Sequence, residues 1–166
     1  MIYIRKLNPN KDIGTKYQSW MNDIEIHKYT EQRYKKHTLK DIKNFVIQKN
    51  KSKNEFLYGI FLKKTKAHVG NIKLGPINFV HKIAEVSYFI GEKKLWGKGY
   101  TTKAIKEIIK IARIKKIKKL KATLYQMNLG SKKVLEKNGF INEGILKSEI
   151  ICNKKRYNSY IYGKIL

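Results

Sequence analysis

The loop between a hydrophobic strand and the strongest predicted helix carries residues suited to phosphate binding. It reads Trp96-Gly97-Lys98-Gly99-Tyr100-Thr101-Thr102, and the helix is expected to run from Gly99 to about Ile114. Glycines let a phosphate approach the backbone closely, and the free N–H groups of a first helical turn attract anions. Lys98 adds positive charge at the same point. The loop therefore predicts a phosphate site, with an ordinary tight turn as the alternative.

Two common nucleotide-binding motifs do not fit this loop. The third glycine of G-x-G-x-x-G is absent because Thr102 stands in its place, and no Gly-Lys-Ser/Thr sequence follows four spacer residues. A dinucleotide fingerprint and a Walker loop are therefore both excluded.

Hydrophobic patterns of two periods predict a mixed α/β domain. Alternating apolar residues predict strands at residues 2–7, 56–62, 67–74, 83–90, 120–125, 140–151 and 157–165. Three-to-four spacing predicts helices at 12–21, from Leu39 onward, at 99–114 and at 130–137. Thr38 to Asp41 approximates a capping box, and Gly75-Pro76 is expected to end a strand. Without a linker or repeat, residues 1–166 are expected to form one domain, with helices against a single sheet.

The chain is strongly basic, with 38 Lys and Arg residues against 12 Asp and Glu residues and a net charge of +26. Such a field attracts anions, although a lysine-rich solvated surface is the simplest explanation. The sharper interpretations are an anionic cofactor or substrate, or a nucleic acid. The clustered glycine-aromatic motifs of RNA-binding sheets are absent, so a basic nucleic-acid-binding module is the less favoured class.

Composition argues against several other kinds of site. Cys152 is the only cysteine and the histidines are scattered without ligand spacing, so neither an internal disulfide nor a metal site is expected. No apolar run is long enough to cross a membrane, and the first residues form an alternating strand rather than a signal sequence. A cytoplasmic protein without membrane contact is expected.

Three segments resemble, in order and spacing, the core of the GNAT acetyltransferases. They are residues 84–91 (AEVSYFIG), 96–104 (WGKGYTTKA) and 128–140 (NLGSKKVLEKNGF). The nearest branch includes the ribosomal-protein N-terminal acetyltransferases, and the resemblance covers about residues 55–165. It implies a mixed, mostly antiparallel sheet flanked by helices and splayed at the cofactor-binding strands. It also implies acetyl-CoA as co-substrate and no metal.

The resemblance assigns cofactor contacts to matching positions. It implies that backbone groups of Phe89 and Ile90 hold the pantetheine and that loop N–H groups bind the pyrophosphate. Asn128 and Ser131 match the family's Asn-x-x-Ser, which contacts the pantetheine arm and the thiol. The expected cofactor-binding residues are Phe89, Ile90, Trp96, Gly97, Lys98, Gly99, Tyr100, Thr101, Thr102, Asn128 and Ser131. One departure is Thr101, which stands where the family usually has Gly or Ala.

Acetyl transfer to an amine requires a neutral nucleophile, whereas a lysine-like ammonium with a pKa of about 10.4 is protonated at neutral pH. Glu85 is the expected base. Strand alternation places it on the same side as Ser87 and Phe89, and the family often has an acid at this place. A surface carboxylate paired with a lysine is the alternative. The strand N–H near Phe89 or Ile90 is expected to meet the oxyanion.

Ser131 is the expected proton donor to the departing thiolate. Many family members have a tyrosine for this task, but Leu135 occupies that position here. A helix cap is the alternative role for Ser131, and Tyr125 and Tyr162 remain open as donors.

The resemblance implies that the acceptor pocket is built in the region that contains Tyr29 and Arg33, so Tyr29, Arg33 and Glu85 are the expected acceptor contacts. The positive field repels polyamines and basic proteins, which favours an anionic small amine such as a nucleotide-linked amino sugar. Trp20-x-Asn22-Asp23 and residues 70–77 also resemble enzymes of this family that modify surface-polysaccharide sugars. The alternatives are a protein N-terminal or a polyamine acetyltransferase. The protein is expected to be a monomer or a homodimer.

Overall fold

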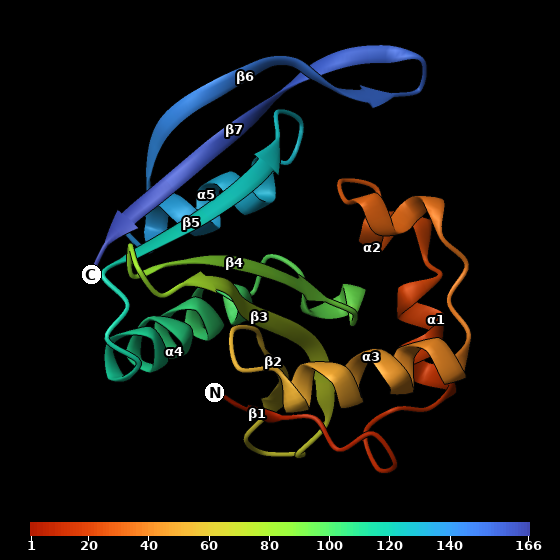
Figure 1. Cartoon of the computed structure of the whole chain (residues 1–166). Coiled ribbons are helices and arrows are strands. Elements are labelled where there is room, and N and C mark those ends of the chain that lie inside the picture. The colour runs from red at the N-terminus through yellow and green to blue at the C-terminus, as the bar shows by residue number, and fades with distance from the viewer.

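The computed structural model describes residues 1–166 and contains one seven-stranded sheet. Along the sheet the strands follow the order β1-β2-β3-β4-β5-β7-β6 (Figure 1). Their bounds are β1 Ile2–Lys6, β2 Phe56–Leu62, β3 His68–Asn78, β4 Ile83–Ile90, β5 Lys119–Tyr125, β6 Ile141–Cys152 and β7 Lys155–Ile165. All neighbouring strands are antiparallel except β4 and β5, which are parallel. The predicted fold class is confirmed.

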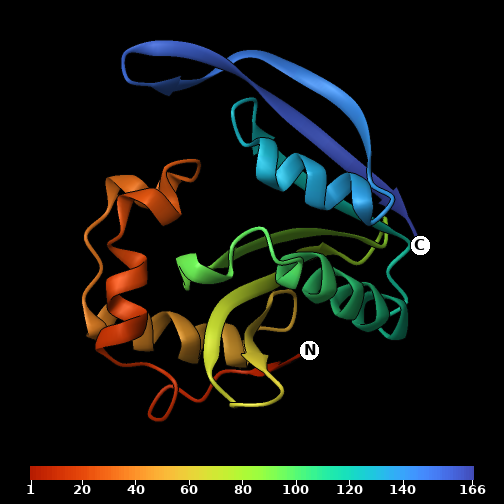
Figure 2. The ribbon, with the colours of Figure 1, turned by 180° about the vertical axis from the view of Figure 1, so that it is seen from behind.

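Helices cover both faces of the sheet (Figures 1 and 2). They are α1 Thr15–Met21, α2 Ile24–His27, α3 Leu39–Lys51, α4 Tyr100–Ile114 and α5 Leu129–Lys137, with 3-10 turns η1 Glu31–Tyr34 and η2 Lys93–Leu95. Adjacent residues of β2 enter different cores: Ile60 joins the cluster with α4 and α5, and Phe61 joins the one with α1 and α3. Because successive strand side chains point to opposite faces, α4 and α5 lie on one face, and α1 and α3 on the other.

Local sequence signals explain most helix boundaries. The capping box is confirmed, because the Thr38 hydroxyl accepts from the Asp41 N–H at 3.1 Å and the Asp41 carboxylate accepts from the Thr38 N–H at 3.2 Å. The first helix begins at Thr15, not at Asp12 as predicted. The Asp12 carboxylate instead accepts from the Asn8 N–H at 2.6 Å and pairs with Arg5 at 2.7 Å. Asp12 therefore closes the turn before the helix.

The predicted strand break at Gly75-Pro76 was wrong. β3 continues to Asn78 through an irregularity, because its register with β4 shifts between Leu74 and Ile77. Gly75 has a φ of 114°, which a residue with a side chain rarely adopts. The pair therefore produces a bulge within a strand rather than its end.

The sheet opens between β4 and β5, as the resemblance implied. The two strands pair only at Ile83 with Lys119, Ala84 with Leu120, and Glu85 with Lys121. Beyond Glu85 and Lys121, β4 pairs only with β3, and β5 pairs only with β7. A V-shaped opening therefore separates the carboxyl-terminal halves of β4 and β5.

Candidate active site

The loop before α4 presents an array of unpaired backbone donors. Gly97 and Gly99 adopt left-handed conformations, with φ values of 74° and 75°. Gly99 is the N-cap and has no side chain to cap the helix, and the first helical bond runs from the Lys103 N–H to the Gly99 carbonyl at 3.1 Å. The N–H groups of Gly97 and of residues 99–102 therefore have no partner in the protein. Such an array at the positive end of a 15-residue helix suits a phosphate.

A cavity of about 450 Å³ extends from this loop along the open edge of β4 to the start of α5. Ten of the eleven predicted cofactor-binding residues line it: Phe89, Ile90, Trp96, Gly97, Gly99, Tyr100, Thr101, Thr102, Asn128 and Ser131. Lys98 is exposed and does not line the cavity. Lys133 and Lys137 on α5 do line it, and they add positive charge that the sequence reasoning did not assign. The fold thus brings the loop, β4 and α5 together around one cavity.

The end of β4 offers one free backbone donor to this cavity. The Trp96 indole N–H donates to the Ile90 carbonyl at 2.8 Å, which holds the loop against the strand. Because the N–H and C=O of one strand residue point to the same side, the Ile90 N–H also faces the open edge. The neighbouring Phe89 backbone then faces β3, where Phe89 pairs with Asn71. Ile90 can therefore contribute its N–H, whereas Phe89 contributes its side chain.

Asn128 and Ser131 occupy the first turn of α5. The Asn128 carbonyl oxygen accepts from the Ser131 N–H at 3.1 Å, so Asn128 caps the helix and keeps its amide N–H groups free. The Ser131 hydroxyl takes no part in this cap. The alternative role for Ser131 as the helix cap is therefore wrong, and its hydroxyl remains available beside the cavity.

Tyr88 is a site residue that the sequence reasoning missed. Its hydroxyl lies 3.5 Å from the Ser131 carbonyl oxygen, and burial raises the pKa of Tyr88 to about 12. The phenol therefore stays protonated at neutral pH. Strand alternation groups Tyr88 with Val86 and Ile90, but nothing in the sequence shows that this face meets α5.

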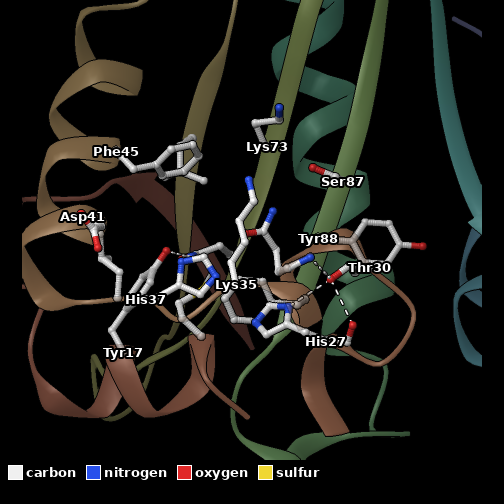
Figure 3. A pocket seen from close by; sticks show the side chains of 16 residues that line it. Tyr17, His27, Thr30, Lys35, His37, Asp41, Phe45, Lys73, Ser87 and Tyr88 are labelled. Atoms are coloured by element: carbon white, nitrogen blue, oxygen red, sulfur yellow. Dashed lines mark hydrogen bonds between the residues drawn. The ribbon is translucent and has the colours of Figure 1, made fainter. Parts of the chain in front are cut away.

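A second cavity of about 520 Å³ lies on the opposite face of β4, enclosed by α1, α3, η1 and strands β2 to β4 (Figure 3). It shares Thr30, Tyr88 and Phe89 with the first cavity. The three shared residues mark the point where a molecule in one cavity can meet a molecule in the other. We call the first the cofactor cavity and the second the acceptor cavity.

The acceptor cavity contains more positive than negative side chains. Lys35 and Lys73 line it, and Lys73 also pairs with Glu55 at 2.7 Å. Its single carboxylate, Asp41, is held by the N–H and hydroxyl of Thr38, which lower the pKa of Asp41. Burial lowers the pKa of His27 to about 4, so this ring is neutral at pH 7. No free carboxylate therefore lines this cavity.

The predicted acceptor contacts lie in other places. Glu85 is exposed at the apex of the splay and lines neither cavity. Tyr29 lines the cofactor cavity and, with Arg33, a separate hollow of about 570 Å³ near the end of β6. The Arg33 guanidinium donates to the carbonyls of Lys28 and Ile151, both at 3.1 Å. Arg33 therefore joins η1 to β6, and its predicted acceptor contact has no support in this geometry.

Comparisons with known proteins agree with this arrangement. The family model for the acetyltransferase (GNAT) domain matches residues 2–141. The chain belongs to the GNAT acetyltransferase family. The predicted family is therefore confirmed.

One curated relative, a probable N-acetyltransferase of Bacillus subtilis, YjcK, is 31% identical over 101 residues, which are 60% of this chain and 55% of that protein. The match thus spans about half of that relative's length. The Vibrio cholerae spermidine N-acetyltransferase, solved in complex with CoA and spermine, has a TM-score of 0.86, 18% identity and coverage of 99% and 95% of the two chains. RimL, a ribosomal L7/L12 α-N-protein acetyltransferase solved with coenzyme A, has a TM-score of 0.86, 17% identity and coverage of 99% and 94%.

No group of three or more His, Cys, Asp and Glu side chains is arranged to hold a metal ion. None of the helices combines the length and apolar character that a membrane span requires.

Proposed function

We propose that this protein transfers an acetyl group from acetyl-CoA to a primary amine by direct attack. The observation that carries the proposal is the meeting of two cavities at Thr30, Tyr88 and Phe89, at the open end of the splay. A cofactor that approaches from the α4 and α5 side can there meet an amine from the α1 and α3 side. Proximity of this kind makes the attack effectively unimolecular.

Each part of the cofactor cavity has a chemical task in this proposal. Acetyl-CoA supplies a thioester carbonyl and a thiolate leaving group. The unpaired N–H groups of residues 99–102 bind the pyrophosphate, and the Ile90 N–H stabilises the oxyanion. Ser131 or Tyr88 protonates the thiolate, because both residues line this cavity, the Ser131 hydroxyl is free and the Tyr88 phenol is protonated. The base predicted at Glu85 lies four residues before Phe89, about 13 Å along the strand, so it can act only through water.

The charges of the acceptor cavity favour an anionic small amine, such as an amino sugar phosphate or a nucleotide-linked amino sugar. Lys35 takes part in no ion pair of the protein and can therefore pair with a ligand phosphate. A polyamine carries several ammonium groups and would need several free carboxylates, whereas the only carboxylate that lines this cavity, Asp41, is engaged in the capping box. The same charges disfavour a basic protein N-terminus. We infer that the acceptor carries its amine and a phosphate on one small molecule.

Two measurements test the function itself. Isothermal calorimetry should show acetyl-CoA binding, and thiol release should occur with one of glucosamine 6-phosphate, a nucleotide-linked amino sugar, spermidine or an N-terminal peptide. A gel shift with DNA and RNA runs in parallel. No acetyl-CoA binding together with tight, salt-sensitive nucleic-acid binding would reject the enzyme. Turnover of spermidine alone would reject the anionic acceptor and keep the enzyme.

Lys35 gives a prediction for the acceptor class. Lys35→Gln should raise the KM for glucosamine 6-phosphate roughly tenfold and leave the KM for glucosamine unchanged. A tenfold change equals about 1.4 kcal/mol, which is the size expected for one lost charge-assisted hydrogen bond. Steady-state thiol-release kinetics measure both values. Lys36→Gln is the matched control, because Lys36 is exposed and lines none of the three cavities described above. Equal effects on both sugars would contradict a phosphate contact at Lys35.

A further inference from the structure

Tyr125 and Phe89 stand at the same level on the two sides of the splay. The last paired residues are Glu85 and Lys121, and four further steps along each strand lead to Phe89 on β4 and Tyr125 on β5. Since side chains alternate, Phe89 shares a face with Glu85, and Tyr125 shares a face with Lys121. Both therefore lie on the acceptor side of the sheet. An amine that comes from the acceptor cavity to a thioester between β4 and β5 approaches from this side of the sheet.

Glu31 reaches this point from the opposite wall. It is the first residue of η1 and follows Thr30, whose hydroxyl caps η1 and which lines both cavities. The Tyr125 hydroxyl donates a hydrogen bond to Oε1 of Glu31. Figure 1 shows the neighbouring α2 segment facing the open end of the splay. The exposed Glu31 carboxylate lines neither cavity itself, but it is attached to the end of β5 and directly follows Thr30, which lines both.

This carboxylate has no cationic partner, although the chain has a net charge of +26. None of the eight salt bridges includes Glu31, and its Oε2 accepts no hydrogen bond. Arg33 lies 5.0 Å from the centre of the Tyr125 ring, but it donates to carbonyls and to the Tyr34 hydroxyl instead. One oxygen of Glu31 is therefore free to accept a proton.

Tyr125 keeps the carboxylate in place. Burial, together with the adjacent Glu31 carboxylate, raises the pKa of Tyr125 to about 12, so the phenol remains a donor across the working pH range. The ionisable groups around this pair are Arg33 and Tyr34 on η1, and β6 contributes only the Ile151 carbonyl.

We propose that Glu31 binds the acceptor ammonium and takes its proton, with Tyr125 as its positioning residue. This inference rests on the proposed function. The ammonium transfers one proton to Oε2 of Glu31, and the freed nitrogen lone pair forms a C–N bond to the thioester carbon. The C–S bond then breaks. The second proton leaves the nitrogen, the thiolate is protonated to CoA thiol, and Glu31 releases its proton to water.

The other carboxylates nearby are less suited to this task. Glu85 lies four residues before Phe89, about 13 Å along β4 from the junction of the two cavities. Asp41 is occupied by the capping box. Glu31 also complements Lys35 four residues later: the carboxylate attracts the amine of the acceptor, and the lysine attracts its phosphate.

The test compares Glu31→Gln, Tyr125→Phe and Glu85→Gln with the control Glu107→Gln, the same change of charge at a partly exposed residue of α4 that pairs only with Lys110. Thiol release is followed from about pH 6 to about pH 9 with the acceptor that the thiol-release screen described above identifies. If no acceptor turns over, acetyl-CoA hydrolysis is followed instead, in which water is the nucleophile. Glu31→Gln should lower kcat/KM by about 10²- to 10⁴-fold at neutral pH. The deficit should shrink as pH rises, because more amine is then neutral without help.

The remaining readouts separate catalysis from folding. Acetyl-CoA affinity of Glu31→Gln, measured by calorimetry, should stay within about twofold of wild type, and Tyr125→Phe should lose less activity than Glu31→Gln. An unchanged rate and pH profile in Glu31→Gln, or a larger loss in Glu85→Gln, would overturn the assignment. A wild type that does not bind acetyl-CoA would contradict the proposed function instead, and this inference with it.

Discussion

His27 shows how a single residue can couple the acceptor cavity to pH. Its side chain is 3% exposed, packs edge-on against Phe89 at 5.2 Å between ring centres, and lies 3.4 Å from the Thr30 hydroxyl through Nδ1. Its Nε2 is buried without a hydrogen-bond partner. Folding therefore places an imidazole where a positive charge would be poorly solvated. The ring helps to set the positions of Phe89 and Thr30, the two residues at which the cavities meet.

The protein should lose stability through His27 as the pH falls from about 6.5 to about 4. The unfolded histidine has a pKa of about 6.5, whereas burial lowers the folded value to about 4. Between these values the unfolded state binds more protons, so the free energy of unfolding decreases as the solution becomes more acidic. Urea unfolding of wild type and His27→Phe at several pH values measures the effect. The wild type should lose up to about 3 kcal/mol more than the variant.

Carboxylates with lowered pKa values, such as Asp12 and Glu55, also lose stabilisation on acidification, but they do so equally in both proteins. The difference between wild type and variant therefore isolates His27. Parallel curves would show that His27 is not buried as a neutral ring.

At the scale of elements, the phosphate site depends on how a loop enters a helix. The left-handed φ of Gly99 turns the chain so that α4 begins with unpaired N–H groups, and the hydrogen bond from Trp96 to Ile90 ties the loop to β4. A side chain at Gly99 would meet no protein atom within 4 Å, so the space there is free for a ligand. The same helix packs Ile105 and Ile108 into the core, which fixes its N-terminus relative to the sheet.

Gly99→Glu should abolish acetyl-CoA binding while the protein stays folded. The added carboxylate repels a phosphate at the helix N-terminus, and the left-handed backbone adds a strain of about 1 kcal/mol. Calorimetry measures the affinity, and circular dichroism reports the fold. Gly144→Glu is the control, since Gly144 also has open space around it and lies on β6. Wild-type affinity in folded Gly99→Glu would remove the phosphate site from this loop.

At the scale of the whole molecule, the net charge of +26 acts on every anion that approaches. Acetyl-CoA carries several phosphate charges, and screening shortens the reach of the field from about 10 Å at 0.1 M salt to about 3 Å at 1 M. Its affinity should therefore fall roughly tenfold between these salt concentrations. Calorimetry in increasing NaCl measures this. The uncharged fragment S-acetyl-pantetheine serves as control, and the same salt dependence for both compounds would exclude an electrostatic contribution.

Several features followed from the sequence alone because they depend on neighbouring residues. Three of them are local patterns: the alternation of residues 83–90, the apolar stripe of residues 100–114 and the Thr38–Asp41 capping box. The structure confirmed the strand and the two helices that these patterns predict. The glycine loop and the Asn-x-x-Ser segment were recognised for the same reason. Each motif keeps its spacing wherever the fold places it.

Only the tertiary structure decided which side chains meet at the acceptor side. η1 and α2 are each four residues long, too short for a hydrophobic period, so only the family resemblance, and no local pattern, pointed to residues 24–34 as part of the acceptor side. Glu31 and Tyr125 are 94 residues apart in the chain. This separation is far longer than any sequence motif, so no motif could have linked the two residues. Tyr29 and Arg33 were placed at the acceptor by sequence, yet Arg33 is held by the Ile151 carbonyl at the far hairpin. Such contacts arise from the packing of whole elements, which local spacing does not encode.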